Sequence, residues 1–195
     1  MSDQDALHGH DSHPAQLELD QGDVYSKYML HSRSEILYVL RAVLQKGSLV
    51  TVYFDHGKSF LLTALVAVDA ENGSLLFDVG SDEEMNIRAL KADRLLFTTS
   101  LDKVKVQFSL KALSSASHEG RAAFRASLPE TVLRLQRREY YRLATPIANP
   151  IYCKMTARSD DGSGKAASIP LLDISGGGVG LMVDPELKDA FKVET

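Results

Sequence analysis

The sequence contains a single cysteine, Cys153, so no intramolecular disulfide can hold this chain together. It also lacks any apolar run near the roughly 18 residues that a membrane helix requires. The first five residues, Met-Ser-Asp-Gln-Asp, contain neither the basic nor the apolar region of a secretory signal. These absences predict a soluble cytoplasmic protein without membrane insertion.

An excess of basic residues is lacking as well, because the formal net charge is −4 over 195 residues. A protein whose whole surface bound nucleic acid would be strongly basic, so no DNA partner is expected. The content of 44% hydrophobic and 25% charged residues matches ordinary globular proteins. The length allows one large or two small domains.

Lysine and arginine are missing from residues 1–23, which contain six acidic residues and few large apolar ones. Such a segment cannot bury enough apolar surface to offset the entropy lost on ordering. Residues 1–24 are therefore predicted to form a disordered acidic tail. The tail contains three histidines, His8, His10 and His13. No metal site is expected from them, because a nearby glycine and proline disrupt any rigid framework.

Residues 25–128 are predicted to form a mainly β domain with a short helix near its start. Ser32 and Glu35 have the spacing of a capping box, and apolar residues follow at helical spacing as far as Gly47. A second short helix is expected from about Ser81 to Lys91. Strands are predicted over residues 49–54, 60–68, 74–79, 94–99, 104–110 and 122–126. Short, regularly spaced strands indicate an antiparallel sheet that closes, or nearly closes, into a barrel.

Pro129 marks the predicted end of this domain, because proline disfavours helix before it and cannot donate to a sheet. Thr131–Leu135 alternates like an exposed strand or an extended linker, and an arginine-rich linker is expected at residues 129–142. Residues 143–195 are predicted to form a second antiparallel β-barrel-like domain, with strands over 151–158, 167–174 and 179–183. Three strands are too few to close a barrel, so the second barrel is expected to be incomplete in this sequence.

Lysine is absent from the basic cluster around the linker, which contains six arginines: Arg121, Arg125, Arg134, Arg137, Arg138 and Arg142. Guanidinium groups bind phosphate oxygens in pairs, bond bidentately to guanine and stack on aromatic planes better than ammonium does. The last three arginines could thus serve a ligand with several phosphates and guanine bases. Tyr140 and Tyr141 could stack on a base or anchor the segment to the barrel. The alternative is a solvated basic linker, or arginines paired with the acidic surface.

A second polar stretch ends a predicted strand at Asp173–Ser175 and continues into Gly176–Gly178. Ile174 is expected to face a core, so Asp173 and Ser175 share the opposite face. The glycines leave backbone amides uncovered, which lets a ligand approach closely. A β-bulge or strand crossover would explain the glycines equally well. A nucleotide P-loop is not expected, because no Lys-Ser/Thr pair and no helical pattern follow.

Taken together, Arg137, the Arg138-x-x-x-Arg142 spacing and the later Asp173-x-Ser175-x-x-Gly178 resemble the paired signature of PilZ domains, which bind bacterial cyclic di-GMP. The β-rich domain before the signature resembles the N-terminal domain of YcgR-type flagellar brake proteins. The resemblance implies that the linker wraps the nucleotide and reorients the two domains. It implies seven ligand-binding residues: Arg137, Arg138, Arg142, Asp173, Ser175, Gly177 and Gly178.

The resemblance predicts a cyclic di-GMP receptor that regulates flagellar motility through motor switch or stator proteins. It implies a cytoplasmic monomer or homodimer that acts at the flagellar basal body, with cyclic di-GMP as ligand and no cofactor. Regulation of exopolysaccharide synthesis is an alternative output, and a β-barrel that binds single-stranded nucleic acid is an alternative of another class. An enzyme is not expected, because no metal cluster, nucleophile–base pair or carboxylate pair emerges from the sequence. Asp55 and His56 next to Ser59 resemble a triad fragment, but adjacent residues in a turn rarely reach that geometry.

Overall fold

The computed structural model describes residues 18–20, 22–158 and 164–185. The chain divides into two compact units, unit 1 over Met1–Gln136 and unit 2 over Arg137–Thr195, which we describe separately. Most of the predicted acidic tail, with its three histidines, lies outside the described residues. None of the helices formed by the described residues combines the length and apolar character that crossing a bilayer requires.

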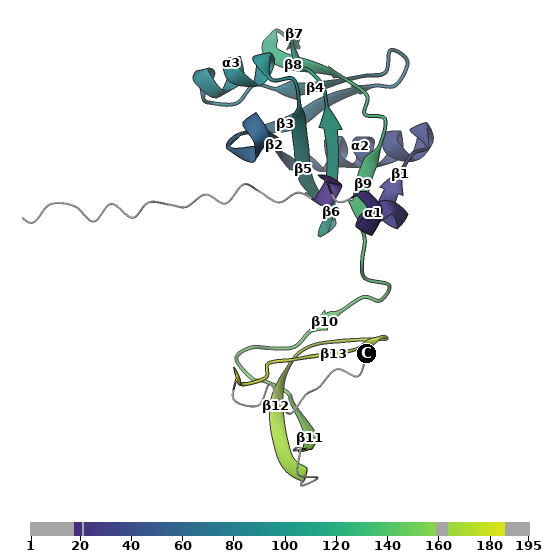
Figure 1. Cartoon of the computed structure of the whole chain (residues 1–195), viewed down its shortest axis with the longest axis vertical. Coiled ribbons are helices and arrows are strands. Elements are labelled where there is room, and N and C mark those ends of the chain that lie inside the picture. The colour runs from purple at the N-terminus through teal and green to yellow at the C-terminus, as the bar shows by residue number, and fades with distance from the viewer. Residues whose placement is uncertain (1–17, 21, 159–163, 186–195) are drawn as a thin grey trace, which may run out of the picture. The chain divides into compact units, whose positions relative to one another are not determined.

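Unit 1 is a nine-stranded antiparallel sheet in the order β1-β9-β6-β5-β2-β3-β4-β8-β7 (Figure 1). The strands are β1 (Met29–Leu30), β2 (Leu49–Phe54), β3 (Ser59–Asp69), β4 (Ser74–Asp78), β5 (Leu95–Leu101), β6 (Val104–Leu110), β7 (Ser114–His118), β8 (Arg121–Ser127) and β9 (Val132–Leu135). The helices are α1 (Gly22–Tyr25), α2 (Arg33–Lys46) and α3 (Glu83–Lys91), with 3-10 turns η1 (Glu18–Asp20), η2 (Ser26–Tyr28) and η3 (Asp55–Gly57).

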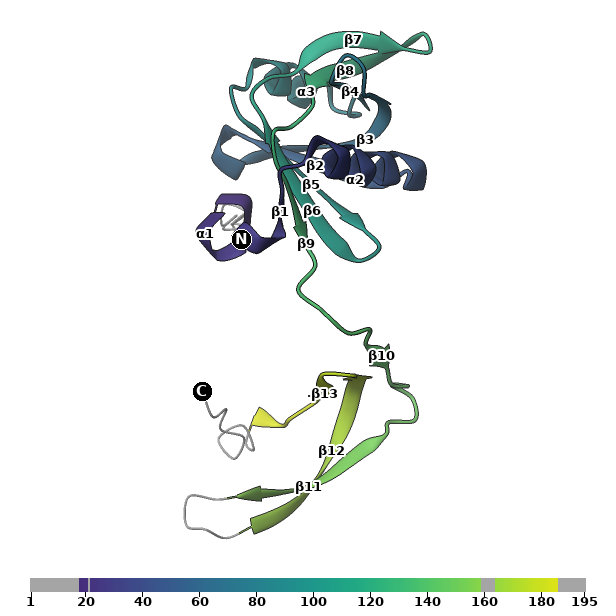
Figure 2. The same cartoon turned by 90° about the vertical axis from the view of Figure 1, so that its right-hand side faces the viewer.

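The first predicted helix is confirmed as α2, which lies against one face of the sheet (Figure 2). Its apolar side buries Ile36, Val39, Leu40 and Val43 against the inward side chains of the strands. The capping box is not formed, however. Ser32 is the N-cap residue, but its side chain makes no capping bond, and its hydroxyl lies 2.8 Å from that of Ser34 instead.

The opposite face of the sheet is partly covered by residues that precede Tyr25. The Leu19 N–H donates to the Gln107 side chain at 3.1 Å, and Gln107 is fully buried. Lys105 donates to Glu18 at 2.7 Å. Burial tends to raise the pKa of Glu18, but the bonds from Lys105 and from the backbone outweigh it, so the pKa is lowered. Among the described residues, ordered structure therefore starts before Tyr25, where it was predicted to begin.

The exposure predicted for β9 from the sequence pattern was wrong. Thr131–Leu135 was predicted to be an exposed strand or linker, but Val132, Leu133 and Leu135 are buried. The strand pairs with β6 on one side and β1 on the other. Val132 and Leu133 point to opposite faces and both are buried, so both faces of the sheet are covered at this point, and only Arg134 stays exposed.

Hydrogen bonds connect the turn between β2 and β3 to the helix α3. Arg88 of α3 donates to the Asp55 carboxylate at 2.5 Å and to the Ser59 hydroxyl at 2.7 Å. The bond from Arg88 holds the pKa of Asp55 below its usual value. These two side chains thus tie α3 to the sheet through one arginine.

Unit 2 contains β10 (Leu143–Ala144), β11 (Tyr152–Arg158), β12 (Gly164–Ser175) and β13 (Gly178–Leu181). The long strand β12 is central: it pairs with β10, β11 and β13, all antiparallel. The mainly β fold is confirmed in both units. In the ranges that the structure describes, however, no strand pairing closes either sheet, so barrel closure stays a prediction.

Gly47 generates a testable prediction, because it ends α2 with φ +59° and ψ 33° and has open space around it. Replacement by alanine introduces no clash and only the cost of the left-handed backbone conformation. We expect Gly47→Ala to lower the free energy of unfolding by about 1 kcal/mol, and Gly47→Asn to lower it less. Urea denaturation measures both variants, and equal stability of Gly47→Ala and the parent protein would contradict the assigned helix end.

Candidate functional site

The two polar stretches of the sequence meet in unit 2 because β10 pairs with the end of β12. Leu143 lies opposite Ile174, and Ala144 lies opposite Asp173. Arg142 immediately precedes β10, so this pairing holds it beside Asp173. The Arg142 Nη1 and Asp173 Oδ2 atoms are 3.7 Å apart. Both side chains are partly exposed, so the ion pair orients Arg142 more than it stabilises the fold.

A tight hairpin turn, Ser175–Gly178, joins β12 to β13, and we call it the glycine turn. Ser175 pairs with Gly178 across the turn. The Ser175 hydroxyl donates to the Gly178 carbonyl at 3.1 Å, which closes the turn. Gly178 has φ +147° and open space where a side chain would be, so glycine is required here by backbone conformation. At Gly178 the turn therefore leaves the backbone uncovered.

A cavity of about 490 Å³ lies between the glycine turn and the segment Arg137–Arg142, which we call the arginine segment. This volume falls in the range usual for small-molecule sites. All seven residues predicted from the sequence lie around it. The lining residues are Arg137, Arg138, Glu139, Tyr140, Arg142, Asp173, Ser175, Gly177, Gly178 and Val179.

The charges around this cavity favour an anion. Three arginines face two carboxylates, Glu139 and Asp173, so the lining is formally positive although the whole chain carries −4. Arginine side chains can bind phosphate oxygens and guanine edges bidentately. Within the described residues, no group of three or more histidine, cysteine or acidic side chains could hold a metal ion.

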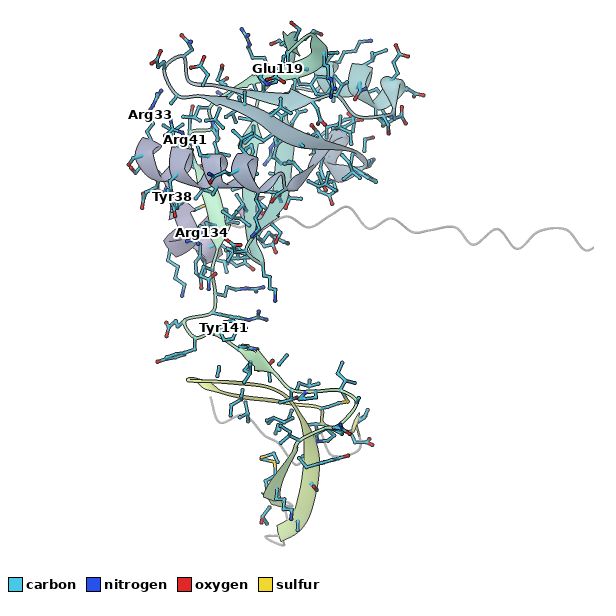
Figure 3. The ribbon with its side chains drawn as sticks, turned by 180° about the vertical axis from the view of Figure 1, so that it is seen from behind. Arg33, Tyr38, Arg41, Glu119, Arg134 and Tyr141 are labelled. Carbon is cyan, nitrogen blue, oxygen red and sulfur yellow. The ribbon has the colours of Figure 1, made fainter. Side chains whose placement is uncertain are left out.

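The two tyrosines of the arginine segment have different environments. The ring of Tyr140 lies against Gly176 and Gly177, which supports the anchoring interpretation for this residue. Tyr141 is 84% exposed, and Figure 3 shows it at the surface of the chain. The expectation that Ile174 faces a core is wrong for the described residues, because Ile174 is 44% exposed.

Sequence reasoning missed Gly180. It pairs with Asp173 across β12 and β13. A side-chain carbon at this position would lie 3.1 Å from the carboxyl carbon and from both oxygens of Asp173. The alternation of Gly178 and Gly180 along β13 was the available signal, because a glycine inside a strand often marks the close approach of another group.

Comparison with known proteins relates most of the chain to one family. Residues 28–134 match the family model of the flagellar regulator YcgR, PilZN domain. The chain is 36% identical to the flagellar brake protein YcgR of Azoarcus sp. (strain BH72) over 170 residues, which are 87% of this chain and 66% of that protein. It is 37% identical over 164 residues to the flagellar brake protein YcgR 1 of Dechloromonas aromatica (strain RCB), covering 84% of this chain and 62% of that protein.

Among solved structures, the chain is similar to YcgR from Escherichia coli in complex with c-di-GMP. The TM-score is 0.59 and the sequence identity is 26%, over 82% of this chain and 66% of that chain. This chain therefore spans about two thirds or less of the length of these relatives.

The close packing of Gly180 on Asp173 leads to a second prediction. Gly180→Ala should displace the Asp173 carboxylate and weaken its pairing with Arg142. We expect the Arg142 Nε–Hε resonance in NMR spectra to shift toward its position in Asp173→Asn, which removes the charge. Leu181→Ala, one residue further along β13, serves as the control and should leave this resonance in place. An unchanged resonance in Gly180→Ala would show that Asp173 does not depend on the glycine.

Proposed function

This chain belongs to the YcgR family of flagellar brake proteins, and on that basis we propose that it is a receptor for cyclic di-GMP that regulates flagellar motility. The observation that carries the proposal is the cavity between the arginine segment and the glycine turn. Its lining unites the arginines with the Asp-x-Ser-x-x-Gly stretch in one site. The similar structure of Escherichia coli YcgR in complex with c-di-GMP supports the choice of ligand.

Each half of the cavity suits one part of a cyclic dinucleotide with two phosphates and two guanines. Arg137, Arg138 and Arg142 would bind phosphates and the Hoogsteen edges of the guanines. Asp173 lies 3.7 Å from Arg142 and would orient it for this purpose, or accept from a guanine N–H. Ser175, Gly177 and Gly178 would bind phosphate or ribose from the other side. A receptor needs only to bind its ligand without a chemical reaction, so we propose no enzymatic activity.

Binding would change the arrangement of the domains through the charge of the arginine segment. A ligand shifts a conformational equilibrium only by its differential affinity for the two states. Without an anion, the arginine segment carries a net charge of +2, from three arginines and Glu139, and two phosphates would neutralise it. We infer that the ligand orders the linker at residues 129–142 and fixes the angle between the domains at 25–128 and 143–195. Since β9 holds residues 132–135 in the sheet of unit 1, the part of the linker that can move begins at Gln136.

The output would pass from the N-terminal domain to a protein of the flagellar motor. Motor switch and stator proteins are the proposed partners, and the cytoplasmic side of the basal body is the proposed place of action for a monomer or homodimer. The family name of the relatives supports this output over exopolysaccharide synthesis. A cavity of about 490 Å³ also suits a small nucleotide better than a single-stranded polymer, which requires a continuous basic groove.

Isothermal titration calorimetry with cyclic di-GMP tests the ligand and the site. The full chain should bind cyclic di-GMP. Arg138→Ala and Asp173→Ala should each reduce the affinity about 10- to 100-fold, because each removes a charged hydrogen-bonding group. Arg134→Ala is the matched control, since Arg134 is an exposed arginine of β9 that does not line the cavity.

Two results would contradict the assignment. Undiminished affinity in both Arg138→Ala and Asp173→Ala would exclude the proposed site. Absence of cyclic di-GMP binding, together with salt-sensitive binding of a single-stranded oligonucleotide, would favour the polymer-binding alternative.

A swimming assay tests the output. In the source bacterium, expression of a diguanylate cyclase should shrink the soft-agar swimming zone of cells with the parent protein. Cells that carry Arg138→Ala at the native locus should keep a larger zone, whereas cells with Arg134→Ala should behave like the parent. An equal reduction of the swimming zone in all three strains would show that this protein does not mediate the effect of cyclic di-GMP on motility. A change confined to exopolysaccharide staining would point to the alternative output.

A further inference from the structure

The ring of Tyr140 lies directly on the backbone of the glycine turn. A side-chain carbon at Gly176 would lie 2.7 Å from Tyr140 Cδ1, 3.2 Å from Cε1 and 3.3 Å from Cγ. At Gly177 it would lie 3.0 Å from Cδ2 and 3.4 Å from Cε2. One edge of the ring thus contacts Gly176 and the other edge contacts Gly177. Separations below about 3 Å are shorter than carbon atoms at van der Waals contact allow.

Backbone conformation does not explain why these two positions are glycine. Neither Gly176 nor Gly177 has a φ in the left-handed range, whereas Gly178 has φ +147°. Gly178 also differs in having open space where a side chain would be. The absence of side chains at Gly176 and Gly177 is therefore accounted for by the tyrosine ring that occupies this space.

The contact matters because of where Tyr140 lies in the arginine segment. Arg138 precedes it by two residues and Arg142 follows it by two residues. Two residues of chain span at most about 7 Å, so a fixed Tyr140 restricts the backbone of both arginines to the neighbourhood of the turn. Pairing of β10 with β12 holds the far end of the segment, and Tyr140 is a second attachment point inside it.

We propose that Tyr140 is a positioning residue that holds the arginine segment on the glycine turn before the ligand arrives. Its ring restricts the backbone of Arg138 and Arg142 to the neighbourhood of the glycine turn, where both arginines line the cavity. The ligand then loses less free energy to ordering the segment, which is the general benefit of preorganisation. This role rests on the proposed binding of cyclic di-GMP, but the attachment itself exists without ligand.

Four variants and a control test this role in the full chain. Calorimetry with cyclic di-GMP should show about a tenfold loss of affinity for Tyr140→Ala. Tyr140→Phe should bind like the parent, because only ring carbons contact the glycines. Gly176→Ala should lose affinity to a similar extent by displacing the ring. Adding Gly176→Ala to Tyr140→Ala should cause no further loss, because the clash needs the ring. Tyr141→Ala, the neighbouring exposed tyrosine, is the control and should bind normally.

Amide hydrogen exchange supplies a readout that needs no ligand. In the ligand-free protein, the amides of Arg137–Arg142 should exchange faster in Tyr140→Ala and Gly176→Ala than in the parent. Exchange in Tyr140→Phe and Tyr141→Ala should match the parent. If Tyr140→Ala prevents folding, the comparison of Gly176→Ala with the parent by both methods still decides the question.

The outcomes separate this inference from the proposed function. If the parent binds cyclic di-GMP but Tyr140→Ala binds equally well, the positioning role is overturned while the receptor function stands. Additive losses in the double variant would also overturn it. If the parent does not bind cyclic di-GMP, the receptor function fails. The exchange rates then decide alone whether Tyr140 holds the segment, and unchanged rates would overturn that attachment.

Discussion

The pairing of β10 with the end of β12 is the constraint on which the candidate site depends. It consists of only two residues, Leu143 and Ala144, opposite Ile174 and Asp173. Backbone hydrogen bonds of this kind fix position to within a fraction of an ångström, whereas the Arg142–Asp173 ion pair is long and partly exposed. The strand pairing therefore brings the two polar stretches together, and the ion pair sets the direction of one arginine.

Glycines shape the other side of the site for three separate physical reasons. Gly178 provides a backbone conformation that other residues rarely adopt. Gly176 and Gly177 make room for the ring of Tyr140, and Gly180 makes room for the Asp173 carboxylate. A family signature that contains one of these glycines thus covers only part of the packing that forms the cavity. The arginine segment is consequently a partly attached chain rather than a free basic linker.

Local patterns predicted most elements of unit 1, because hydrophobic periodicity and turn residues act over a few positions. For the helix α2 and the strands β2 and β6, the predicted first and last residues agree with the observed ones to within a residue or two. The two-residue strand β1 was not predicted, and two longer strands were predicted incorrectly, each for its own reason. The β7 segment Ser-Ser-Ala-Ser-His has few of the residues that favour strands, and it forms at an edge by pairing with β8. The β9 strand alternates like an exposed one, but it is paired on both edges and contacts η2, so most of its side chains are buried.

The sequence by itself determined the chemical groups available for a site: arginines, a carboxylate and glycines in a spacing that resembles PilZ domains and predicts an anionic guanine nucleotide as ligand. Side-chain identity dictates charge and hydrogen-bonding groups, so these properties need no fold. Only the tertiary structure decided that Arg142 lies beside Asp173, that Tyr140 rests on Gly176 and Gly177, and that Gly180 supports the carboxylate. These are contacts between strands and turns far apart in the chain, and no local periodicity encodes which strand pairs with which.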